Sequence, residues 1–516
     1  MYTVSMEAPG FQVATYTIEL QARQTVRIDG QITVAAQAQS VNVTSEAAPV
    51  VNTDVSNIAE TKTGRELVDL PVAIATRASG STSPMSTLTT QPGVQTDSSG
   101  NISVAGTKPA MTQISIDGIS SMGPRSNGPL TELFPSFNSI AEIHVSELDN
   151  SAEYGGISDI TTISKSGTNG FHGGVFENLQ NTALDARNPF NKVKPIVKMN
   201  DFGRYVGGPI WRDHTFFFAS YEGLRLPRQT TLVESVPSVA LRSGDLSVYT
   251  KPVYQPGTGT PYANNQIPMS EIAPLSLNAL KYLFPLPNTG AANAIANNYV
   301  QNMPTPISSD QAGLRLDQVI NSKQTFFVRG TYKTRSVEVA PSPGGSPTPT
   351  GSALLGPFST PEIDFGFSAA HNFVISPTVV NEARVGYNGN HTATTFGAVP
   401  TQVYSELGMT GLADNLPTGN AVPNFNIAGF QQTGGSSSNV GRNGTFQIID
   451  NLSWTKGTHS FKFGGDYRYL TGHSENVYAQ LRMGQYNFNG AVTGGIGAAN
   501  VLHRQSIRGF SARYTR

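Results

Sequence analysis

From about residue 171 onward, apolar and polar side chains alternate with a period of two. The clearest case is the segment 461–469, where aromatic residues hold one face and charged residues the other: Phe461, Phe463, Tyr467 and Tyr469 against Lys462, Asp466 and Arg468. Residues 326–333 repeat the pattern, with Arg329 and Lys333 opposite Phe326 and Tyr332. This period predicts antiparallel strands with one wet and one apolar face.

About nine or ten such strands are expected from the period-two pattern. They lie near residues 171–180, 199–210, 215–225, 311–320, 325–335, 364–375, 379–389, 444–455, 459–471 and 484–489. Short connections at 211–214, 321–323, 376–378 and 456–458 alternate with long ones near 181–198, 226–310, 336–362 and 390–443. Tight turns on one rim and long loops on the other are typical of a transmembrane β-barrel.

The part before residue 171 has a different character. Residues 2–45 contain short alternating segments and predict a small β-sandwich. Residues 46–170 mix short helical stretches with strands, which predicts a compact α+β unit. Two runs rich in Ser, Thr and Gly, 79–83 and 96–101, are predicted to be mobile loops. The expected fold class is therefore mainly β, with a remnant sandwich, a small α+β unit and the first part of a large antiparallel barrel.

Composition narrows the class of protein further. The 516 residues carry a net charge of −1, which argues against a nucleic-acid partner. Gly (52) and Pro (33) are abundant, which favours a loop-rich chain. Cysteine is absent, so disulfides, thiolate metal sites and thiol nucleophiles are excluded. The sequence contains no run of about 18 apolar residues, so it predicts no membrane-spanning helix. The strands of a membrane barrel leave a weaker hydropathy signal than such a helix.

No convincing catalytic or metal-binding motif occurs in the sequence. The eight histidines lack metal-ligand spacing, and neither a nucleophile elbow nor a phosphate-binding Walker loop is present. The carboxyl pair Asp149 and Glu153 invites comparison with glycosidases, but such pairs are usually ordinary surface charges. We therefore expect no catalytic residues, no metal and no cofactor, and we predict that the protein is not an enzyme.

A series of short motifs occurs in a characteristic order along most of the chain, to about residue 490. The motifs are Ala8-Pro9-Gly10-Phe11, Leu70-Pro71-Val72, Gln91-Pro92-Gly93-Val94, Ile116-Asp117-Gly118-Ile119, Ala152-Glu153-Tyr154-Gly155, Lys165-Ser166-Gly167-Thr168-Asn169-Gly170 and Gly207-Gly208-Pro209-Ile210. As a set they resemble TonB-dependent outer-membrane receptors of the Oar-like group. That group carries a carboxypeptidase-regulatory-like β-sandwich, a carbohydrate-binding-like fold, at its front.

The resemblance implies three domains. Residues 1–45 would be part of the front sandwich, residues 46–170 the plug, and residues 171–516 part of the barrel. Two departures stand out, since residues 156–163 are more polar than the matching family strand and the first residues do not form a signal peptide. Family barrels have 22 strands, so the resemblance predicts a fragment truncated at both ends.

The resemblance also implies a function in the cell outer membrane. A plug would block the barrel, an unidentified extracellular substrate would bind the long loops, and the TonB energy-transducing complex would pull the plug to allow uptake. Outer-membrane lipid would surround the barrel.

Individual residues acquire roles from the resemblance. The segment Val41-Asn42-Val43-Thr44 is a candidate TonB box, and a plain strand that finishes the sandwich remains the alternative. Asp117 and Gly118 are expected to form a tight turn in the plug. Residues at the plug-to-barrel junction would be Glu153, Tyr154, Gly155, Lys165, Gly167 and Asn169.

Other interpretations remain open on the sequence alone. A surface β-rich adhesin or carbohydrate-binding protein would also have long Gly/Pro/Asn loops, and a secreted polysaccharide hydrolase is a third reading. The aromatic residues of the strands form either a core stripe or a lipid-facing band, and the charged opposite faces favour lipid contact. The residues concerned are Phe216, Phe217, Phe218, Tyr221, Trp454, Phe461, Phe463, Tyr467 and Tyr469.

Overall fold

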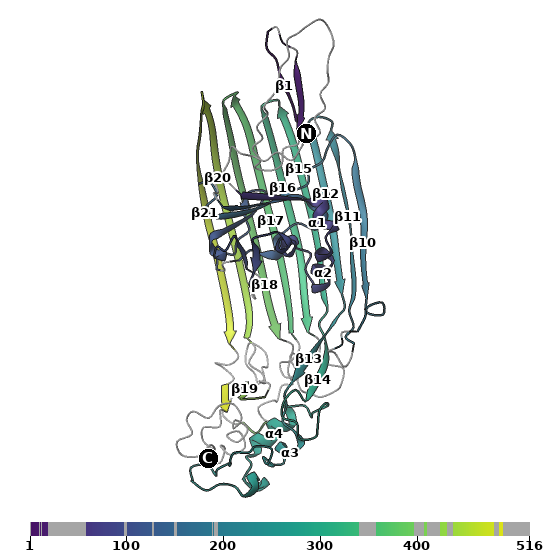
Figure 1. Cartoon of the computed structure of the whole chain (residues 1–516), viewed down its shortest axis with the longest axis vertical. Coiled ribbons are helices and arrows are strands. Elements are labelled where there is room, and N and C mark those ends of the chain that lie inside the picture. Colours follow the sequence, from purple (N-terminus) through teal and green to yellow (C-terminus); the bar gives the residue numbers. More distant parts are fainter. Residues whose placement is uncertain are drawn as a thin grey trace.

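The computed structural model consists mainly of β-structure arranged around one large sheet (Figure 1). It describes residues 2–9, 11, 13–18, 58–97, 101–125, 128–148, 152–187, 189, 194–339, 358–396, 407–409, 424–430, 437–478 and 485–488. No helix in these ranges is long and apolar enough to cross a membrane. The predicted fold class, mainly β with a large antiparallel sheet, is confirmed.

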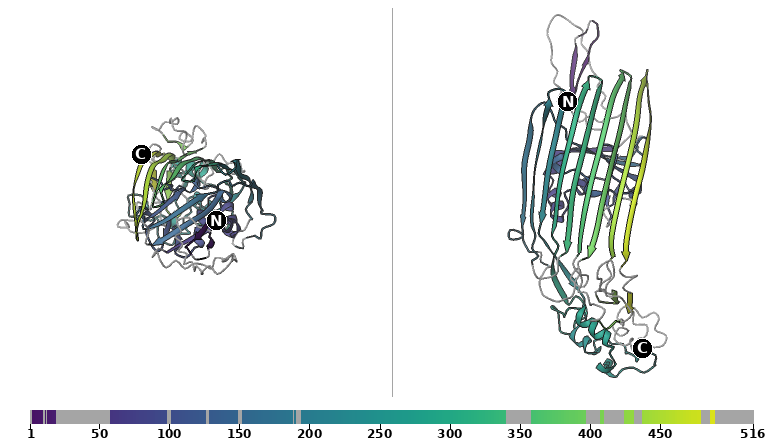
Figure 2. Two further views of the ribbon diagram at one scale, coloured as in Figure 1. Left: turned by 90° about the horizontal axis from the view of Figure 1, so that it is seen from above. Right: turned by 180° about the vertical axis from the view of Figure 1, so that it is seen from behind.

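The large sheet has nine antiparallel strands in the order β10-β11-β12-β15-β16-β17-β18-β20-β21. Their bounds are β10 His172–Asn181, β11 Lys198–Trp211, β12 Thr215–Leu226, β15 Ile307–Asn321, β16 Gln324–Val339, β17 Phe358–Ser376, β18 Val379–Phe396, β20 Ser437–Lys456 and β21 His459–Tyr478. Within the described residues, β10 and β21 each pair on one side only, so this sheet is not closed. Seen from above, it curves around the α+β unit (Figure 2).

The α+β unit, hereafter the plug, covers residues 58–164 and lies against the concave face of the large sheet. Its five-stranded sheet has the order β3-β8-β9-β6-β7. The strands are β3 Ile58–Thr63, β6 Thr112–Ile116, β7 Ile119–Ser120, β8 Ile140–Leu148 and β9 Ser158–Ser164, and the helices are α1 Gly64–Asp69 and α2 Pro71–Ser79; β4 Val94–Thr96 and β5 Ile102–Val104 pair separately.

Local sequence signals explain the plug helices. Thr63 caps α1 and forms a reciprocal capping box with Glu66. Pro71 begins α2, and Gly80 ends it with a φ of 99°, a left-handed conformation that glycine adopts without strain. The plug has its own apolar core, which includes Leu67, Leu88, Ile114, Phe134 and Phe137.

The polar strand β9 is buried although its sequence is rich in Ser, Thr and Asp. Two of its hydroxyl groups are paired with those of the neighbouring strand β6: Ser158 with Thr112 at 2.8 Å, and Thr161 with Ser115 at 3.1 Å. Pairing these groups removes most of the cost of burying them. The departure from the apolar family pattern is therefore compatible with a packed plug.

The long connection 226–310 is a folded unit, not an open loop. It contains the hairpin β13 (Gln229–Glu234) and β14 (Tyr299–Pro304) and the helices α3 (Val239–Arg242) and α4 (Pro274–Tyr282). It shares an apolar core with two short strands, β19 (Asn424–Ile427) from the connection between β18 and β20, and β22 (Gln485–Phe488) from the chain after β21. We call this assembly the cap; it lies at the end of the sheet opposite the N-terminal hairpin (Figure 1).

One predicted strand differs from the structure. The segment 484–489 was expected in the barrel, but β22 pairs in parallel with β19 in the cap. At the front, β1 (Tyr2–Met6) and β2 (Ala14–Ile18) form a hairpin, whereas residues 19–45 of the predicted sandwich lie outside the described residues. The other nine predicted strands are present, and all of them except β10 are longer than the alternation suggested.

Candidate functional site: the interface between plug and sheet

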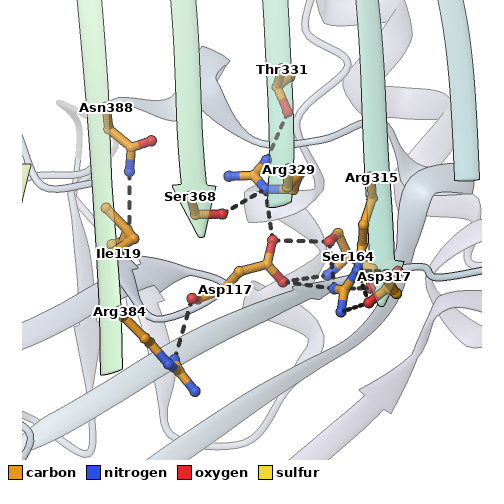
Figure 3. Close-up of polar contacts among 10 residues, drawn as sticks. All are labelled: Asp117, Ile119, Ser164, Arg315, Asp317, Arg329, Thr331, Ser368, Arg384 and Asn388. Carbon is orange, nitrogen blue, oxygen red and sulfur yellow. Dashed lines mark hydrogen bonds and ion pairs between the residues drawn. The ribbon is translucent and has the colours of Figure 1, made fainter. Parts of the chain in front are cut away.

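The turn between β6 and β7 brings the plug into direct contact with the large sheet (Figure 3). Asp117 and Gly118 both have positive φ, 48° and 84°, as the sequence predicted for a tight turn. The Asp117 carboxylate accepts hydrogen bonds from the Ser164 backbone N–H at 3.0 Å and from the Ser164 hydroxyl at 2.9 Å. These bonds orient the carboxylate toward the sheet.

Two arginines of the large sheet approach the same carboxylate. Arg329 on β16 lies 2.7 Å from Asp117, and Arg315 on β15 lies 3.5 Å away. Arg315 is also paired with Asp317 at 2.8 Å. Since Asp117 and Arg329 are almost completely buried, salt screens this ion pair much less than it screens a pair on the surface.

Three further sheet residues bind the backbone of this turn. Arg384 donates to the Asp117 carbonyl at 3.3 Å, and Asn388 donates to the Ser120 carbonyl at 2.8 Å. Gln447 on β20 accepts from the Ser120 backbone N–H at 2.8 Å. The plug turn is thereby held by β15, β16, β18 and β20 together.

A second polar contact joins helix α2 to the strands β11 and β12. Arg77 lies 2.6 Å from Asp201 and 3.9 Å from Glu222, and all three side chains are buried. The guanidinium carbon also lies 4.4 Å from the centre of the Phe137 ring. One plug cation thus lies opposite two sheet carboxylates.

A third contact involves the plug segment before β8. Glu132 pairs with Lys333 of β16, and Lys333 also donates to Thr82 at 2.9 Å. Burial raises the pKa of Glu132, but the charges of Lys333 and Arg335 outweigh it, so the net pKa is lowered. Residues 81–83 lie in a loop, as expected, but Thr82 and Ser83 are buried in this contact, and the mobility of the loop stays a prediction.

A polar cavity of about 410 Å³ lies between the plug and the strands β18, β20 and β21. Its plug wall includes Glu153, Tyr154 and Gly155, and Glu153 pairs with Lys462 of β21. Arg468, also on its wall, donates to Gln113 of the plug at 2.9 Å. A cavity of this size with charged walls is suited to hold ordered water.

The predicted junction between plug and sheet runs past the short turn 211–214. Asn169 and Asp213 exchange two hydrogen bonds: the Asn169 side-chain amide donates to the Asp213 carboxylate at 2.6 Å, and the Asp213 backbone N–H donates to the Asn169 side-chain oxygen at 2.8 Å. The Lys165 ammonium lies 5.3 Å from the centre of the Tyr205 ring, and burial lowers its pKa. A Cβ on Gly167 would lie 2.3 Å from the Phe217 carbonyl oxygen, so the close approach requires glycine.

The structure brings Asp117, Gly118 and Glu153 to the plug–sheet interface, whereas Lys165, Gly167 and Asn169 lie beside it at the strand rim. The candidate TonB box at 41–44 and the carboxylate Asp149 lie outside the described residues. Sequence reasoning missed the contacts of the sheet arginines and of Arg77. The only signal was the row of charges on the wet faces of the strands, such as Arg329 and Lys333.

The aromatic residues divide between the two faces of the sheet. Phe218 is buried on the plug side, whereas Phe217 lies on the opposite face. Exposed aromatic residues on the outer face of β21 are Phe461, Phe463, Tyr467 and Tyr469. Whether an aromatic side chain faces the plug or the outside therefore depends on its position along its strand.

Comparison with known proteins places this architecture in a family. The family model described as "Outer membrane beta barrel domain" matches residues 163–512. This chain belongs to the outer membrane β-barrel family. The match begins in the last strand of the plug and includes the large sheet and the cap, and the predicted outer-membrane location is thereby confirmed.

A curated relative points to one branch of this family. The chain is 26% identical over 234 residues to the TonB-dependent transporter Oar of Myxococcus xanthus. The match covers 43% of this chain but only 22% of Oar. The predicted Oar-like resemblance is confirmed, whereas a carboxypeptidase-regulatory-like front domain remains a prediction. The relative is a transporter, not an enzyme.

Solved structures of other outer-membrane proteins are also similar. The outer membrane transporter YddB from Escherichia coli gives a TM-score of 0.46 at 12% identity, covering 81% of this chain and 48% of that one. The copper transporter OprC gives 0.42 at 10% identity, covering 83% and 56%. This chain spans about half the length of these structures.

Proposed function

We propose that this protein acts in the outer membrane as a TonB-dependent receptor that takes up an extracellular substrate. The observation that carries the proposal is the way in which the plug is held. Its main apolar core is its own, while ion pairs and hydrogen bonds around Asp117, Arg77 and Glu132 join it to the sheet.

A polar interface suits a plug that must leave and return. Hydrogen bonds to the sheet are exchangeable for hydrogen bonds to water, so separation costs far less than breaking an apolar core. The cavity beside Glu153 supplies space from which water reaches the contacts. Substrate and applied force would then shift a two-state equilibrium between a docked and a displaced plug.

The orientation of the sheet follows from its two kinds of connection. Bacterial barrels have short turns at the periplasmic rim and long loops outside the cell. The N-terminal hairpin lies at the short-turn end and the cap at the other (Figure 1). The cap would therefore meet the substrate first, and the chain before the plug would be available to a periplasmic partner.

We assign coupling to TonB to residues 41–44. Three of these four residues are β-branched, a composition that suits capture by strand addition. Proline at Val41 and Val43 would remove two backbone N–H groups from such a pair. We expect the double variant V41P/V43P to lose binding to the purified periplasmic domain of TonB, while V51P retains it. Equal binding by both variants would contradict the assigned box.

Plug displacement can be tested without knowing the substrate. The chain has no cysteine, so one introduced at Ser120, which is buried at the interface, is the only thiol in the protein. We expect an impermeant maleimide to label S120C in energised cells that contain TonB, and to label it much more slowly in cells without TonB. V239C, at an exposed position of the cap, which faces outward in the proposed orientation, is the control for reagent access. TonB-independent labelling of S120C would refute a TonB-driven plug, whichever segment TonB binds.

A further inference from the structure

Three nitrogen-rich side chains form one row across adjacent strands near the cap end of the sheet. His391 on β18 is paired with Arg442 on β20, and Arg442 is paired with His473 on β21. Residues that are directly opposite in an antiparallel sheet lie on the same face, with Cβ atoms about 5 Å apart. The three side chains are therefore neighbours.

The row lies on the face of the sheet that points away from the plug. A Cβ on Gly472 would meet Arg125 of the plug at 2.8 Å, so position 472 faces inward and His473 faces outward. Gly386 faces Ile119 of the plug, and the same alternation along β18 directs His391 outward. Arg442 and His473 are exposed.

On the same three strands an aromatic band lies between this row and the short turns. It begins with Trp454 and Phe461 and ends with the row Tyr387, Phe446 and Tyr469. The segment from Phe461 to Tyr469 has nine residues and is about 27 Å long, within the roughly 9–11 residues that a tilted strand needs to cross a membrane. The charged side chain within it, Asp450, accepts a hydrogen bond from Asn381 at 2.8 Å.

The row of His391, Arg442 and His473 starts about 13 Å beyond the aromatic row, measured along the strands. The intervening row contains Gly389 and Gly444, and the Tyr387 side chain lies over both. A Cβ on Gly444 would lie 2.2 Å from the Tyr387 hydroxyl oxygen. The phenol hydroxyl therefore points from the aromatic band toward Arg442.

Among the residues that the structure describes, no acidic side chain forms an ion pair with Arg442. Arg225, on the same face of β12, is held by Asp310 at 2.8 Å, but no ion pair of that kind joins Arg442 to an acidic residue there. Glu475, two residues beyond His473, is the nearest acidic residue along β21 on this face.

We propose that Arg442, His391 and His473, together with the Tyr387 hydroxyl, bind the phosphate of an anionic lipid headgroup. The guanidinium supplies a planar pair of donors that matches phosphate oxygens, and the imidazoles and the phenol add donors on either side. The position favours lipid over a dissolved anion, because acyl chains would cover the aromatic band below the row. The choice of the outer leaflet rests on the orientation proposed above.

The test uses the protein purified from outer membranes in mild detergent. Native mass spectrometry would measure binding of phosphatidic acid, with diacylglycerol as the probe that lacks phosphate. We expect R442Q to weaken phosphatidic acid binding by at least about tenfold, the effect of losing a charge-assisted pair of hydrogen bonds. R212Q, which removes the same charge from a short turn, is the matched control and should bind as the parent does.

Heat-modifiable gel mobility would show that each variant is folded. Y387F is a milder change that removes one hydroxyl group, and it should weaken phosphatidic acid binding less than R442Q does. Equal binding of phosphatidic acid by the parent, R442Q and Y387F would overturn the proposal. Displacement of phosphatidic acid by an equal concentration of inorganic phosphate would overturn the assignment to lipid. Neither result depends on TonB or on substrate uptake, so failure here is distinct from failure of the proposed function.

Discussion

At the scale of single residues, Asp117 illustrates how one carboxylate joins three parts of the molecule. It binds Ser164 within the plug and two arginines of the large sheet. Removing one partner of a buried ion pair is costly because the remaining charge stays out of water without compensation. The identity of residue 117 should therefore matter more than that of most surface carboxylates.

We expect D117N to weaken plug docking by about 3 kcal/mol, because Arg329 would remain buried without its carboxylate. Hydrogen exchange of the Ser164 amide and of the β6–β7 turn is the measurement, and exchange should become faster by about two powers of ten. E177Q, an exposed carboxylate on β10, is the control and should change nothing. Unchanged protection in D117N would mean that the turn is held by its backbone contacts alone.

Glu132 provides a pH prediction. Its pKa is lowered below the ordinary 4.5 in the folded protein, so its ionised form contributes stability above that value, and the contribution is lost as the pH falls through the lower folded value. We expect the pair with Lys333 to hold at pH 7 and at pH 5 and to weaken below about 4.5. Proteolysis of the plug from pH 7 to pH 3 would measure this. In E132Q, the increase in proteolysis that follows protonation of residue 132 should be missing. A pH profile of proteolysis identical to that of the parent would contradict the assignment.

At the scale of elements, the junction between β9 and β10 depends on close backbone approach. Gly167 passes beside the carbonyl oxygens of Gly208 and Phe217, while Gly170, three residues later, has open space around its Cβ position. The two glycines look alike in sequence, since both lie in one polar loop. Only the packing against β11 and β12 distinguishes them.

We expect G167A to destabilise the protein by about 1–3 kcal/mol, since a methyl group would overlap backbone atoms that cannot rotate away. The matched variant G170A should be neutral within about 0.5 kcal/mol. Thermal unfolding in detergent, followed by loss of heat-modifiable mobility, is the measurement. Similar midpoints for the two variants would mean that the junction shifts to accommodate the added methyl group.

The strands themselves were the most predictable elements. Alternation placed Arg329 and Lys333 on the wet face, and both lie against the plug. The strand ends were less predictable, because β17 and β18 extend into segments that contain Pro361 and many Asn and Thr residues. Hydrogen bonding to a neighbouring strand stabilises such segments although their own propensity for β-structure is weak.

At the scale of the whole molecule, loops from different hairpins fold together into the cap. Phe425 of β19 is fully buried and stacks on Tyr486 and Phe488 of β22, with ring centres 5.1 and 6.3 Å apart. The same core contains α4 from the connection 226–310. The cap should therefore lose its structure as one unit and independently of the sheet.

We expect F425A to destabilise the cap by about 3–5 kcal/mol through loss of buried area and creation of a cavity. Hydrogen exchange should show faster exchange in α4, β19 and β22 together, with β16 and β17 unchanged. V239A, at an exposed position of α3, is the control in the same cap. Faster exchange confined to β19 and β22 would show that the cap consists of separate loops.

The sequence by itself determined the large antiparallel sheet, its wet and apolar faces, the short and long rims and the tight turn at Asp117. Each of these depends on neighbouring residues, through the two-residue period of a strand or the φ preference of a turn. It also contained the motifs by which the Oar-like resemblance was predicted.

Only the tertiary structure decided which charges meet. Arg315, Arg329 and Arg384 are far from Asp117 in sequence, and their convergence depends on the register of several strands and on the position of the plug. The row of His391, Arg442 and His473 has the same origin, because a shift of one residue in either pairing would separate the three side chains. Local patterns carry no information about register between distant strands, so these sites become visible only in the folded molecule.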